Sequence, residues 1–517
     1  MIPPDTMRTD AGDINIGRFL SKRAQFDGDR VGLIVGDRRL TFRDLNTAAN
    51  QAAHALLELG VTRGERVAVL MRNGVQYLAT YYGCAKIGAI LCGINWRLAA
   101  PEIDHVLRDS EASILIYDPE FAPAVDALPS PAPKLLPATA RPNVPGTAFD
   151  ALCAIASRAE PESLNDIADT PLVLVYTSGT TGHPKGAVLT HRQMFWSSTT
   201  MAASHDYHWG DVSLVPTPLF HVGGLSFATL FVHLGATLLV LPAWEPGAVL
   251  KLIAREKVNH FFAVPAMLRG LLEHADFPRT DLSSVRWILS GGAPMPVELI
   301  RAFEAAGIRL QQTYGATETA GPATLVDLGH TLSKAGSIGL PYFHTEVRVV
   351  NRQGVEAAVG EVGELRIRAP HLMTGYWRNV EATQDAFDDG WLKTGDLGRR
   401  DEDGYLYVVD RAKDMIISGG ENIYPAEIEA VLQTHPSVME IAVIGVPDAQ
   451  WGEIACAIAV PRPGQVLSLG DVRGFCENKL ARYKIPRRLV VSSTALPRNA
   501  TGKLLKAVLR ERYAVAA

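Results

Sequence analysis

The sequence predicts an α/β and α+β protein, in which a large N-terminal multi-layer domain with mixed sheets precedes a small α+β domain. Three observations support this prediction. The chain has 517 residues, more than one ordinary domain holds. Helix and strand patterns alternate along its first half, which is typical of layered α/β domains. The segment after residue 410 has its own series of helix and strand signals.

The first half gives a clear example of this alternation. Thr41 is a suitable helix N-cap, apolar residues follow at helical spacing from Leu45 to Leu56, and Gly60 can end the helix. Residues 66–70 (RVAVL) then predict a short buried strand, and residues 172–176 (LVLVY) predict another. A helix followed by buried strands is the expected unit of a layered sheet domain.

Between these strands, residues 121–145 are rich in proline and alanine, which predicts a surface connection. The apolar stretch 228–241 contains His233 and Gly235 and is too short to span a bilayer, so we expect a buried strand or helix there. Residues 1–16 are polar and lack the plan of a signal peptide. We therefore expect a cytoplasmic protein without a transmembrane segment, and peripheral contact with a membrane stays open.

The C-terminal part begins after residues 396–410, which have the character of a domain boundary. Helix signals follow at residues 425–433, 468–480 and 503–512, and strand signals at residues 441–444 and 455–460. This mixture predicts a small α+β domain.

Composition excludes several functional classes. With 55 acidic against 50 basic residues, the formal net charge is -5, which argues against nucleic acid as the main partner. The five cysteines are scattered without a Cys-x-x-Cys pair, so neither a zinc site nor a disulfide framework is predicted. His205 and His208 are close in sequence, but no third metal ligand is near them. We interpret both as surface residues.

The strongest chemical signal is the segment 177–186 (TSGTTGHPKG), which directly follows a predicted strand. Such a loop exposes backbone N–H groups and hydroxyls that converge on a phosphate chain. Lys185 adds positive charge. The segment is not a Walker A loop, because His-Pro follows Gly182 where that motif has Lys-Ser/Thr. A flexible polar turn is the alternative, but ten residues in this order favour phosphate binding.

A second motif covers residues 312–318 (QTYGATE). The ring of Tyr314, next to glycine, suits stacking on an adenine. Thr317 and Glu318 supply oxygen ligands for a hard cation such as Mg²⁺, which commonly binds through one or two carboxylates and substrate phosphates. Taken alone, Glu318 would be a surface carboxylate, and its position after Tyr314 reverses that interpretation.

Two further segments leave alternatives open. Residues 290–294 (SGGAP) follow an apolar run, and their small side chains either form a tight turn or leave room for a flat ligand. His221, in the segment 220–224 (FHVGG), is either a satisfied core residue or part of a pocket wall.

The remaining motifs lie in the C-terminal half. Asp396, in the turn 394–396 (TGD), can accept two hydrogen bonds from a ribose diol. Residues 410–425 (DRAKDMIISGGENIYP) contain a glycine pair that is at least a turn. Lys503 ends the segment 497–503 (PRNATGK). A lone C-terminal lysine is usually a solvated charge, but its place at the end of this loop favours a function.

These motifs, in this order along nearly the whole chain, resemble the adenylate-forming superfamily of acyl-CoA synthetases, nonribosomal adenylation domains and firefly luciferases. The sequence looks most similar to bacterial fatty-acyl-CoA synthetases, and plant-type coumarate-CoA ligases are more distant. The resemblance implies an AMP-binding domain over residues 1–409, a hinge at Asp410 and a mobile lid domain over residues 411–517.

The resemblance also implies roles for single residues. Lys503, Glu318 and Lys185 are the expected catalytic residues, and Glu318 and Thr177 are the expected ligands of Mg²⁺, the one expected cofactor. Gly419 and Gly420 are expected to line the CoA tunnel. The expected ATP contacts are Thr177, Ser178, Gly179, Thr180, Thr181, Gly182, Gly292, Ala293, Pro294, Gln312, Thr313, Tyr314, Gly315, Thr317, Asp396, Arg411 and Lys503. The expected acyl pocket comprises His221, Gly223, Gly224 and Gly315.

The implied reaction has two steps. A carboxylate attacks the α-phosphate of ATP to give acyl-AMP and pyrophosphate, and the thiol of CoA then attacks the acyl carbon. Gly223 stands where coumarate-type ligases place an aromatic residue, so we expect a medium- to long-chain fatty acid, with an aromatic or cyclic acid as the alternative. The expected partners are these small molecules, and a homodimer is one open option for the oligomeric state.

Three rival functions stay open at this point. An adenylating enzyme that loads a separate carrier protein would have the same motifs. A luciferase-like oxygenase is not separated positively by any of them. A nucleotide-binding module without catalysis is opposed by the joint presence of the five motif residues Lys185, Glu318, Asp396, Arg411 and Lys503.

Overall fold

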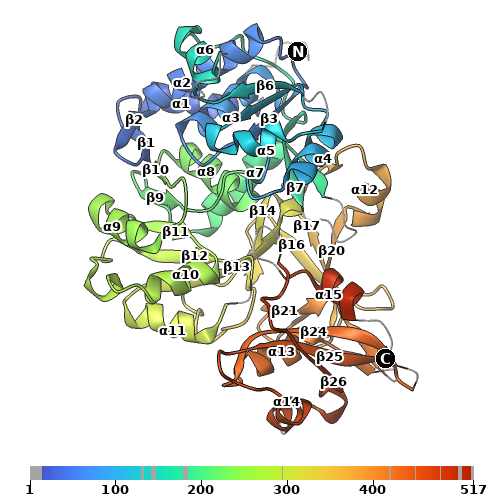
Figure 1. Cartoon of the computed structure of the whole chain (residues 1–517). Helices are drawn as coiled ribbons and strands as arrows, with labels where there is room; N and C mark the ends of the chain where they lie inside the picture. Colours follow the sequence, from blue (N-terminus) through green and yellow to red (C-terminus); the bar gives the residue numbers. More distant parts are fainter. Residues whose placement is uncertain are drawn as a thin grey trace, which may run out of the picture. The chain divides into compact units, whose positions relative to one another are not determined.

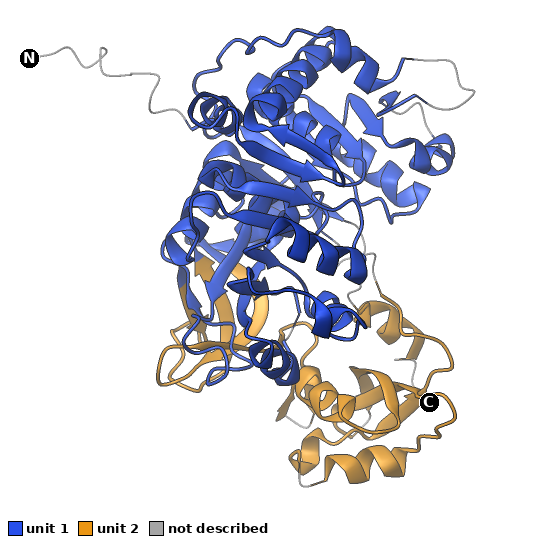
Figure 2. Ribbon diagram, turned by 90° about the vertical axis from the view of Figure 1, so that its left-hand side faces the viewer, with its two compact units in different colours: residues 1–346, 368–392 blue, residues 347–367, 393–517 orange. Residues whose placement is uncertain are grey.

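The computed structural model describes residues 14–129, 133–140, 147–177, 184–293, 295–418, 421–448, 450–477, 479–498 and 504–513. The chain forms two compact units (Figure 2). Unit 1 comprises Met1–Glu346 and Arg368–Leu392, and unit 2 comprises Val347–Ile367 and Lys393–Ala517. Figure 1 labels the helices and strands in chain order.

The first sheet of unit 1 has seven strands in the order β18-β8-β7-β4-β3-β5-β6. Its central strands pair in parallel, whereas β8 is antiparallel to both of its neighbours. Its strands are β3 (Arg66–Leu70), β4 (Ile90–Gly93), β5 (Ile114–Tyr117), β6 (Lys134–Pro137), β7 (Pro171–Thr177), β8 (Lys185–Thr190) and β18 (Gly375–Tyr376).

The second sheet of unit 1 has nine strands in the order β15-β14-β13-β12-β11-β9-β10-β1-β2. The run from β13 to β1 is parallel, and the strands at both ends are antiparallel. Its strands are β1 (Val31–Val35), β2 (Arg38–Thr41), β9 (Val212–Val215), β10 (Thr237–Val240), β11 (His260–Phe262), β12 (Trp287–Ser290), β13 (Arg309–Ala316), β14 (Gly321–Leu325) and β15 (Leu340–Pro341).

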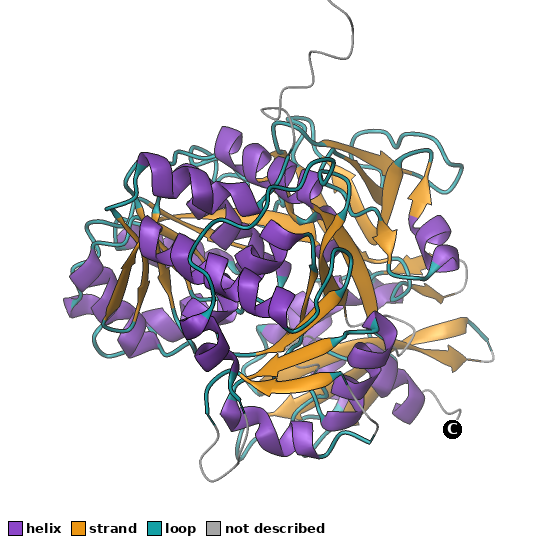
Figure 3. Cartoon of the chain, turned by 90° about the horizontal axis from the view of Figure 1, so that it is seen from above, coloured by secondary structure: helices purple, strands orange, loops and turns teal. Residues whose placement is uncertain are grey.

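The helices of unit 1 lie alongside these strands (Figure 3). They bury apolar faces on the sheets; Val249, Leu268 and Leu299 of three successive helices share one core with strand residues of the second sheet. The helices are α1 (Gly17–Phe26), α2 (Phe42–Glu58), α3 (Val75–Ile87), α4 (Ala100–Ser110), α5 (Ala122–Asp126), α6 (Phe149–Ile155), α7 (His191–Ser204), α8 (Val222–Leu234), α9 (Pro246–Glu256), α10 (Pro265–Leu272), α11 (Val297–Ala305) and α12 (Val380–Ala386), with short 3-10 turns η3 (Pro119–Phe121), η4 (Phe277–Arg279) and η5 (Thr317–Thr319).

Several predicted elements are confirmed. Helix α2 begins directly after Thr41, whose hydroxyl accepts from the Asp44 N–H while the Asp44 carboxylate accepts from the Thr41 N–H, a capping box. Strand β3 has the predicted bounds, and β7 contains the predicted run 172–176. The apolar stretch 228–241 divides into the end of α8 and strand β10.

Two expectations are wrong. Residues 121–145 are not only a surface connection, because they contain α5 and the edge strand β6, which pairs in parallel with β5. Proline is tolerated at such an edge, which is why composition hid the strand. His205 is not a surface residue, since its ring stacks on Trp287 at 5.1 Å and its Nε2 lies 2.7 Å from the Tyr342 hydroxyl. His208 is exposed, as expected.

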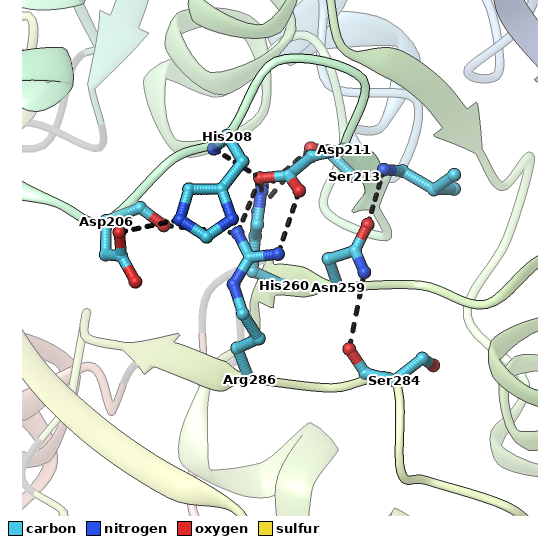
Figure 4. Close-up of polar contacts among 9 residues, drawn as sticks. Asp206, His208, Asp211, Ser213, Asn259, His260, Ser284 and Arg286 are labelled. Atoms are coloured by element: carbon cyan, nitrogen blue, oxygen red, sulfur yellow. Dashed lines mark hydrogen bonds and ion pairs between the residues drawn. The ribbon is translucent and has the colours of Figure 1, made fainter.

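A buried polar cluster joins the amino ends of three neighbouring parallel strands of the second sheet (Figure 4). Asp211 precedes β9, His260 begins β11 and Arg286 precedes β12. Arg286 donates to both carboxylate oxygens of Asp211, at 2.8 and 2.6 Å, and His260 Nε2 donates to the same carboxylate at 3.1 Å. Burial acts to raise the pKa of Asp211, but these hydrogen bonds outweigh it and hold that pKa below its ordinary value.

The C-terminal sheet of unit 2 has the strand order β23-β22-β25-β24, with β26 paired in parallel to β25. Helix α13 has the predicted bounds, whereas α14 ends at Cys476, before the predicted end at residue 480. These elements are β22 (Ile416–Ser418), β23 (Glu421–Ile423), β24 (Val438–Asp448), β25 (Gly452–Pro461), β26 (Arg488–Val491), α13 (Pro425–Gln433), α14 (Leu469–Cys476), η6 (Arg482–Lys484) and α15 (Lys506–Tyr513).

A further sheet has five strands, and the boundaries between the two units fall within three of them, β16, β17 and β20. Its strands are β16 (Glu346–Val350), β17 (Gly363–Arg368), β19 (Phe387–Asp388), β20 (Trp391–Arg400) and β21 (Leu406–Arg411). Within the described ranges, no helix combines the length and the apolar character that crossing a bilayer requires.

Candidate active site

Two of the predicted motifs lie at the carboxyl edge of the nine-stranded sheet. Strands β12 and β13 are parallel neighbours, with Ser290 beside Gln312, so the segments that follow them leave the sheet side by side. Ligands of α/β proteins bind at such an edge. The backbones approach closely, because a Cβ added to Gly291 would lie 2.5 Å from the Thr313 carbonyl oxygen. Glycine at position 291 is therefore required by packing, whether or not a flat ligand binds.

Gly315 is also required by packing. Strand β13 turns back into the antiparallel β14, and a Cβ at Gly315 would lie 2.2 Å from the Gly321 carbonyl oxygen. The turn between the strands is held from outside by two serines. The hydroxyls of Ser197 on α7 and Ser226 on α8 both donate to the Ala320 carbonyl oxygen, at 2.8 and 2.7 Å. The neighbouring Glu318 is thereby carried on a fixed turn.

Three of the four predicted acyl-pocket residues, His221, Gly223 and Gly224, follow β9, which ends at the same edge, and lie at the start of helix α8. Gly224 is required by packing, because a Cβ there would lie 2.2 Å from the Pro218 carbonyl oxygen. Gly223 is different, since its Cβ would make only ordinary contact, at 3.5 Å, with Phe262 at the carboxyl end of β11. Phe262 is half-buried and stacks on Phe227 at 5.3 Å.

His221 is the N-cap residue of α8, and its ring lies 4.3 Å from the Phe220 ring. Burial lowers the pKa of His221 to about 4, and the charge of Arg97 acts in the same direction. The imidazole is therefore neutral at pH 7. A neutral ring here is compatible with both interpretations of the sequence, a satisfied core residue or a pocket wall.

Glu318 lies in η5 and is held through its backbone and its side chain. The Met373 N–H donates to the Glu318 carbonyl oxygen at 2.8 Å, and the Tyr376 hydroxyl donates to Glu318 Oε1 at 2.7 Å. Among the described residues, Oε2 has no hydrogen-bond partner. Burial, followed by the charge of Glu318, raises the pKa of Tyr376 well above its ordinary value, so the hydroxyl stays protonated and remains a donor.

Thr177 and Lys185 flank the predicted phosphate-binding loop. They are register partners at the ends of β7 and β8, and the Thr177 hydroxyl donates to the Lys185 carbonyl oxygen at 3.4 Å. Lys185 Nζ lies 5.4 Å from the centre of the Tyr376 ring. Tyr376 thus contacts both Lys185 and Glu318. The loop residues Ser178, Gly179, Thr180, Thr181 and Gly182 lie outside the described residues.

The site fits Mg²⁺ bound together with phosphates. Glu318 keeps one carboxylate oxygen available among the described residues, and oxygen is the ligand atom that Mg²⁺ prefers. In the described part of the chain, no group of three or more His, Cys, Asp or Glu side chains could hold a metal ion. A cation at Glu318 would therefore take further ligands from water and from substrate phosphates, which is how Mg²⁺ commonly binds.

In unit 2, the predicted ribose-binding residue Asp396 lies opposite Arg411, another of the predicted ATP contacts. Asp396 on β20 pairs in register with Arg411 on β21, and Arg411 Nε lies 3.0 Å from Asp396 Oδ1. Asp396 is buried and Arg411 is half-buried. A carboxylate oriented by a guanidinium is a suitable acceptor for two hydroxyls, because the charge stays in place and the cation limits its rotation.

Asp410, the predicted hinge residue, connects β21 to α13 within unit 2. Its Oδ2 accepts from the Ala426 N–H at 2.8 Å, in the first turn of α13, and its Oδ1 accepts from the Arg411 N–H at 2.7 Å. Burial raises the pKa of Asp410, although the two N–H donors oppose this shift. The predicted site residues Pro294, Gly419, Gly420 and Lys503 lie outside the described residues.

Tyr376 and Phe262 were missed by reasoning from the sequence. Strand β18 has two residues, so it has no periodicity that a sequence pattern could reveal. The contact of Tyr376 with Glu318 spans 58 positions. Phe262 ends the three-residue strand β11, and only its place at the carboxyl edge beside Gly223 marks it.

Comparisons with known proteins agree with this geometry. The model of the AMP-binding enzyme family matches residues 20–377, and that of the AMP-binding enzyme C-terminal domain matches residues 427–503. The long-chain-fatty-acid–CoA ligase FadD13 of Mycobacterium tuberculosis is 42% identical over 508 residues, covering 96% of this chain and 98% of that protein. The feruloyl-CoA synthase of an Amycolatopsis species is 40% identical over 499 residues, covering 96% and 99%.

A solved structure shows the same fold. The o-succinylbenzoate coenzyme A synthetase MenE of Bacillus subtilis, in complex with ATP and magnesium ion, superposes with a TM-score of 0.86 at 34% identity and covers 95% of this chain and 99% of that one. A family model that matches most of the chain and a relative that aligns along nearly all of it lead to one conclusion. The chain belongs to the AMP-binding enzyme family.

Proposed function

We propose that the protein is an ATP-dependent acid–thiol ligase, an acyl-CoA synthetase. It converts a carboxylate, ATP and CoA into acyl-CoA, AMP and pyrophosphate through an acyl-adenylate. The observation that carries this proposal is the contact of Tyr376 with both Lys185 and Glu318, with Thr177 beside Lys185, in a chain of the AMP-binding enzyme family.

Different residues of the described part of the chain bind different parts of ATP. Thr177 and Lys185 bind the phosphates, with the Lys185 ammonium offsetting their negative charge. Glu318 would hold Mg²⁺ with Thr177, and the bound ion would add positive charge beside the phosphates. Asp396 accepts hydrogen bonds from the ribose hydroxyls, and Arg411 orients it. The carboxylate substrate attacks the α-phosphorus, the bond from that phosphorus to the bridging oxygen breaks, and pyrophosphate leaves.

Thioester formation is the second half of the proposal. The CoA thiol attacks the acyl carbon, loses its proton, and AMP leaves with the oxygen that came from the acid. We assign residues 1–409 to adenylate binding and residues 411–517 to a lid that turns at Asp410. Lys503 stabilises the charge that develops during adenylation, and Gly419 and Gly420 line the path of CoA. One rigid-body turn would then serve both reactions.

The proposed acid is a medium- to long-chain fatty acid. The room beside Gly223 supports it, because an added Cβ makes only ordinary contact with Phe262. A fatty-acid ligase among the relatives supports it as well. The aromatic alternative is supported by the feruloyl-CoA synthase. Selection among acids of different length rests on apolar burial, about 0.8 kcal/mol per methylene.

We also propose that the enzyme works in the cytoplasm on small diffusing substrates. All five cysteines are free thiols, and four of them are buried. A reducing compartment keeps such thiols unpaired.

A panel of acids tests the function. Pyrophosphate release is measured with saturated fatty acids of graded length and with aromatic acids, with and without CoA, and the thioester is identified by mass spectrometry. We expect acid-dependent pyrophosphate release and acyl-CoA only when CoA is present. Pyrophosphate release that needs no acid would contradict a CoA ligase. So would the absence of a thioester when CoA is added. Acyl transfer to a phosphopantetheinyl carrier protein but not to CoA would instead establish the carrier-loading alternative.

A further inference from the structure

Tyr376 makes two contacts with opposite charges through different parts of one side chain. Its hydroxyl donates to Glu318 Oε1 at 2.7 Å, and Lys185 Nζ lies over its ring, 5.4 Å from the ring centre. The described residues contain no ion pair between Lys185 and Glu318 or between Lys185 and another carboxylate. The cation and the anion are therefore bridged by a neutral aromatic group.

The backbone around Tyr376 fixes this arrangement. Tyr376 pairs with Ala187 on β8, and the Trp377 N–H donates to the Gly186 carbonyl oxygen at 2.7 Å. The Tyr376 N–H itself donates to the Thr383 hydroxyl of α12 at 2.9 Å. On the other side of Tyr376, the Thr374 N–H donates to the Val188 carbonyl oxygen of β8 at 3.1 Å. The preceding residue, Met373, donates its N–H to the Glu318 carbonyl oxygen at 2.8 Å.

The segment 373–377 is thus a strap that joins the strand carrying Lys185 to the turn carrying Glu318. Both ends of the strap are held by backbone hydrogen bonds, and Tyr376 lies between them. The position of Tyr376 is therefore determined by strand pairing and by the backbone hydrogen bonds on either side of it, and not by its side chain alone.

A direct Lys185–Glu318 ion pair would compete with both functions proposed for these residues. The ammonium would be neutralised before it met a phosphate, and the carboxylate before it met a cation. A phenol avoids this, because its hydroxyl orients the carboxylate without neutralising it and its ring attracts the ammonium without removing its charge. Both residues then keep their charge for the nucleotide.

We propose that Tyr376 is a positioning residue, which keeps Glu318 and Lys185 from pairing with each other and presents one to the divalent cation and the other to the phosphates of a nucleoside triphosphate. This inference rests on the proposed function for the identity of the ligand. Its chemistry concerns only the binding of the nucleotide and the cation, before any acid or CoA reacts.

The test compares Tyr376→Phe with Tyr407→Phe. Tyr407 is a matched control, because its hydroxyl also donates to a carboxylate, Asp401 Oδ2 at 3.1 Å, on the β20–β21 hairpin. Binding of ATP to the full-length protein is measured by calorimetry at a series of Mg²⁺ concentrations, without acid or CoA. For Tyr376→Phe we expect Mg²⁺-dependent binding to weaken about threefold to tenfold, while binding of ATP in EDTA changes little. Tyr407→Phe should match the wild type in both.

A double-mutant cycle separates positioning from a general effect on the fold. In a Glu318→Gln background no carboxylate is left to orient, so adding Tyr376→Phe should change Mg²⁺-dependent binding less than twofold. Tyr376→Leu should also weaken binding of ATP in EDTA, because Lys185 is then free to pair with Glu318. Melting temperatures check that each variant is folded.

Two results would overturn the inference. One is a Tyr376→Phe variant that binds ATP with an unchanged Mg²⁺ dependence. The other is an equal effect of Tyr376→Phe with Glu318 and with Gln at position 318. Failure of the proposed function is a different result, in which no acid elicits pyrophosphate although Mg²⁺ and ATP bind in a Tyr376-dependent manner.

Discussion

At the scale of single residues, the glycines of the motifs have different reasons for being glycine. Gly224, Gly291 and Gly315 each face a carbonyl oxygen within 2.5 Å of where a Cβ would stand. Packing alone requires glycine at these positions, so their presence says little about a ligand. Gly223 has no such backbone neighbour, and the space beside it is therefore open to a functional interpretation.

Gly223→Leu should shorten the range of acids that the enzyme accepts. The leucine side chain would extend beside Phe262 and exclude part of a long acyl chain from the pocket. Each substrate methylene that is no longer buried costs about 0.8 kcal/mol of binding free energy, or about a fourfold loss in kcat/KM. Short acids should react at nearly the rate of the wild type. The helix α8 should tolerate leucine, which is a better helix former than glycine.

The measurement for this variant is kcat/KM over a series of saturated fatty acids. Gly224→Ala provides the contrast, because its Cβ would meet the Pro218 carbonyl oxygen and it should lower the melting temperature without changing the order of preference. An equal loss of activity with all chain lengths in Gly223→Leu would show that Gly223 has only a structural role.

At the scale of elements, the two edges of the nine-stranded sheet have different roles, one in the candidate site and the other in stabilising the fold. Its carboxyl edge carries the motif segments after β9, β12 and β13, and its amino edge carries the buried cluster of Asp211, His260 and Arg286. The cluster ties three strands together by charge-assisted hydrogen bonds. We expect changes at the two edges to have different consequences.

Arg286→Met should destabilise the fold and spare the chemistry. It leaves the Asp211 carboxylate buried without its bidentate partner, and breaking such a pair costs about 3–5 kcal/mol when fully buried. Because the Arg286 side chain is one-quarter exposed, we expect about 2–3 kcal/mol. Urea unfolding monitored by fluorescence measures the loss, and kcat at low temperature should stay near that of the wild type. A stable variant with reduced kcat would refute this separation of roles.

How much could be predicted from the sequence also depends on the element. Helices α2 and α13 and strand β3 have strong caps or apolar periods, and the sequence predicts their bounds closely. Strands β6 and β18 escape prediction because they are short edge strands whose residues follow no pattern.

The candidate site shows the same limit. Its linear motifs are visible because each is a run of unusual residues, such as 312–318. The contact of Tyr376 with Glu318 and Lys185 arises from pairing between β18 and β8, which joins segments far apart in the chain. Local propensity contains no information about such a pairing.

At the scale of the whole molecule, six histidines among the described residues of unit 1 have lowered pKa values. Burial is the main cause, and it lowers the pKa to about 3 for His191 and His205 and to about 4 for His221, His233 and His371. It also lowers the pKa of His260, although the Asp211 carboxylate opposes this shift. An unfolded histidine has a pKa near 6.5. Between these values the unfolded chain binds more protons than the folded one, so the stability of unit 1 falls as the pH falls.

We therefore expect the free energy of unfolding to be nearly constant above about pH 7 and to decrease as the pH falls from about 6.5 toward 4. Each buried imidazole contributes up to about 1.4 kcal/mol per pH unit to the slope. Urea unfolding at several pH values measures it. His371→Leu should reduce the slope by about one proton. A slope near zero between pH 6 and 5 would show that these imidazoles are protonated in the folded protein.

The two half-reactions should separate in a Lys503→Ala variant. We propose that Lys503 acts only during adenylation, so the variant should lose acid-dependent pyrophosphate release by several orders of magnitude and still convert supplied acyl-AMP and CoA into acyl-CoA. Lys251→Ala, on the exposed face of α9, is the control. An equal loss of both half-reactions would contradict a lid that serves them in turn.

The central claim is that the acid is activated as an acyl-adenylate, and an oxygen isotope tests it most directly. The enzyme is incubated with an acid labelled with ¹⁸O in both carboxylate oxygens, together with ATP, Mg²⁺ and CoA, and the nucleotide product is examined by mass spectrometry. Attack of the carboxylate on the α-phosphorus, followed by attack of the thiol on the acyl carbon, leaves one ¹⁸O in AMP. We therefore expect AMP carrying a single ¹⁸O and unlabelled pyrophosphate. ADP with labelled inorganic phosphate, or AMP without label, would contradict the account.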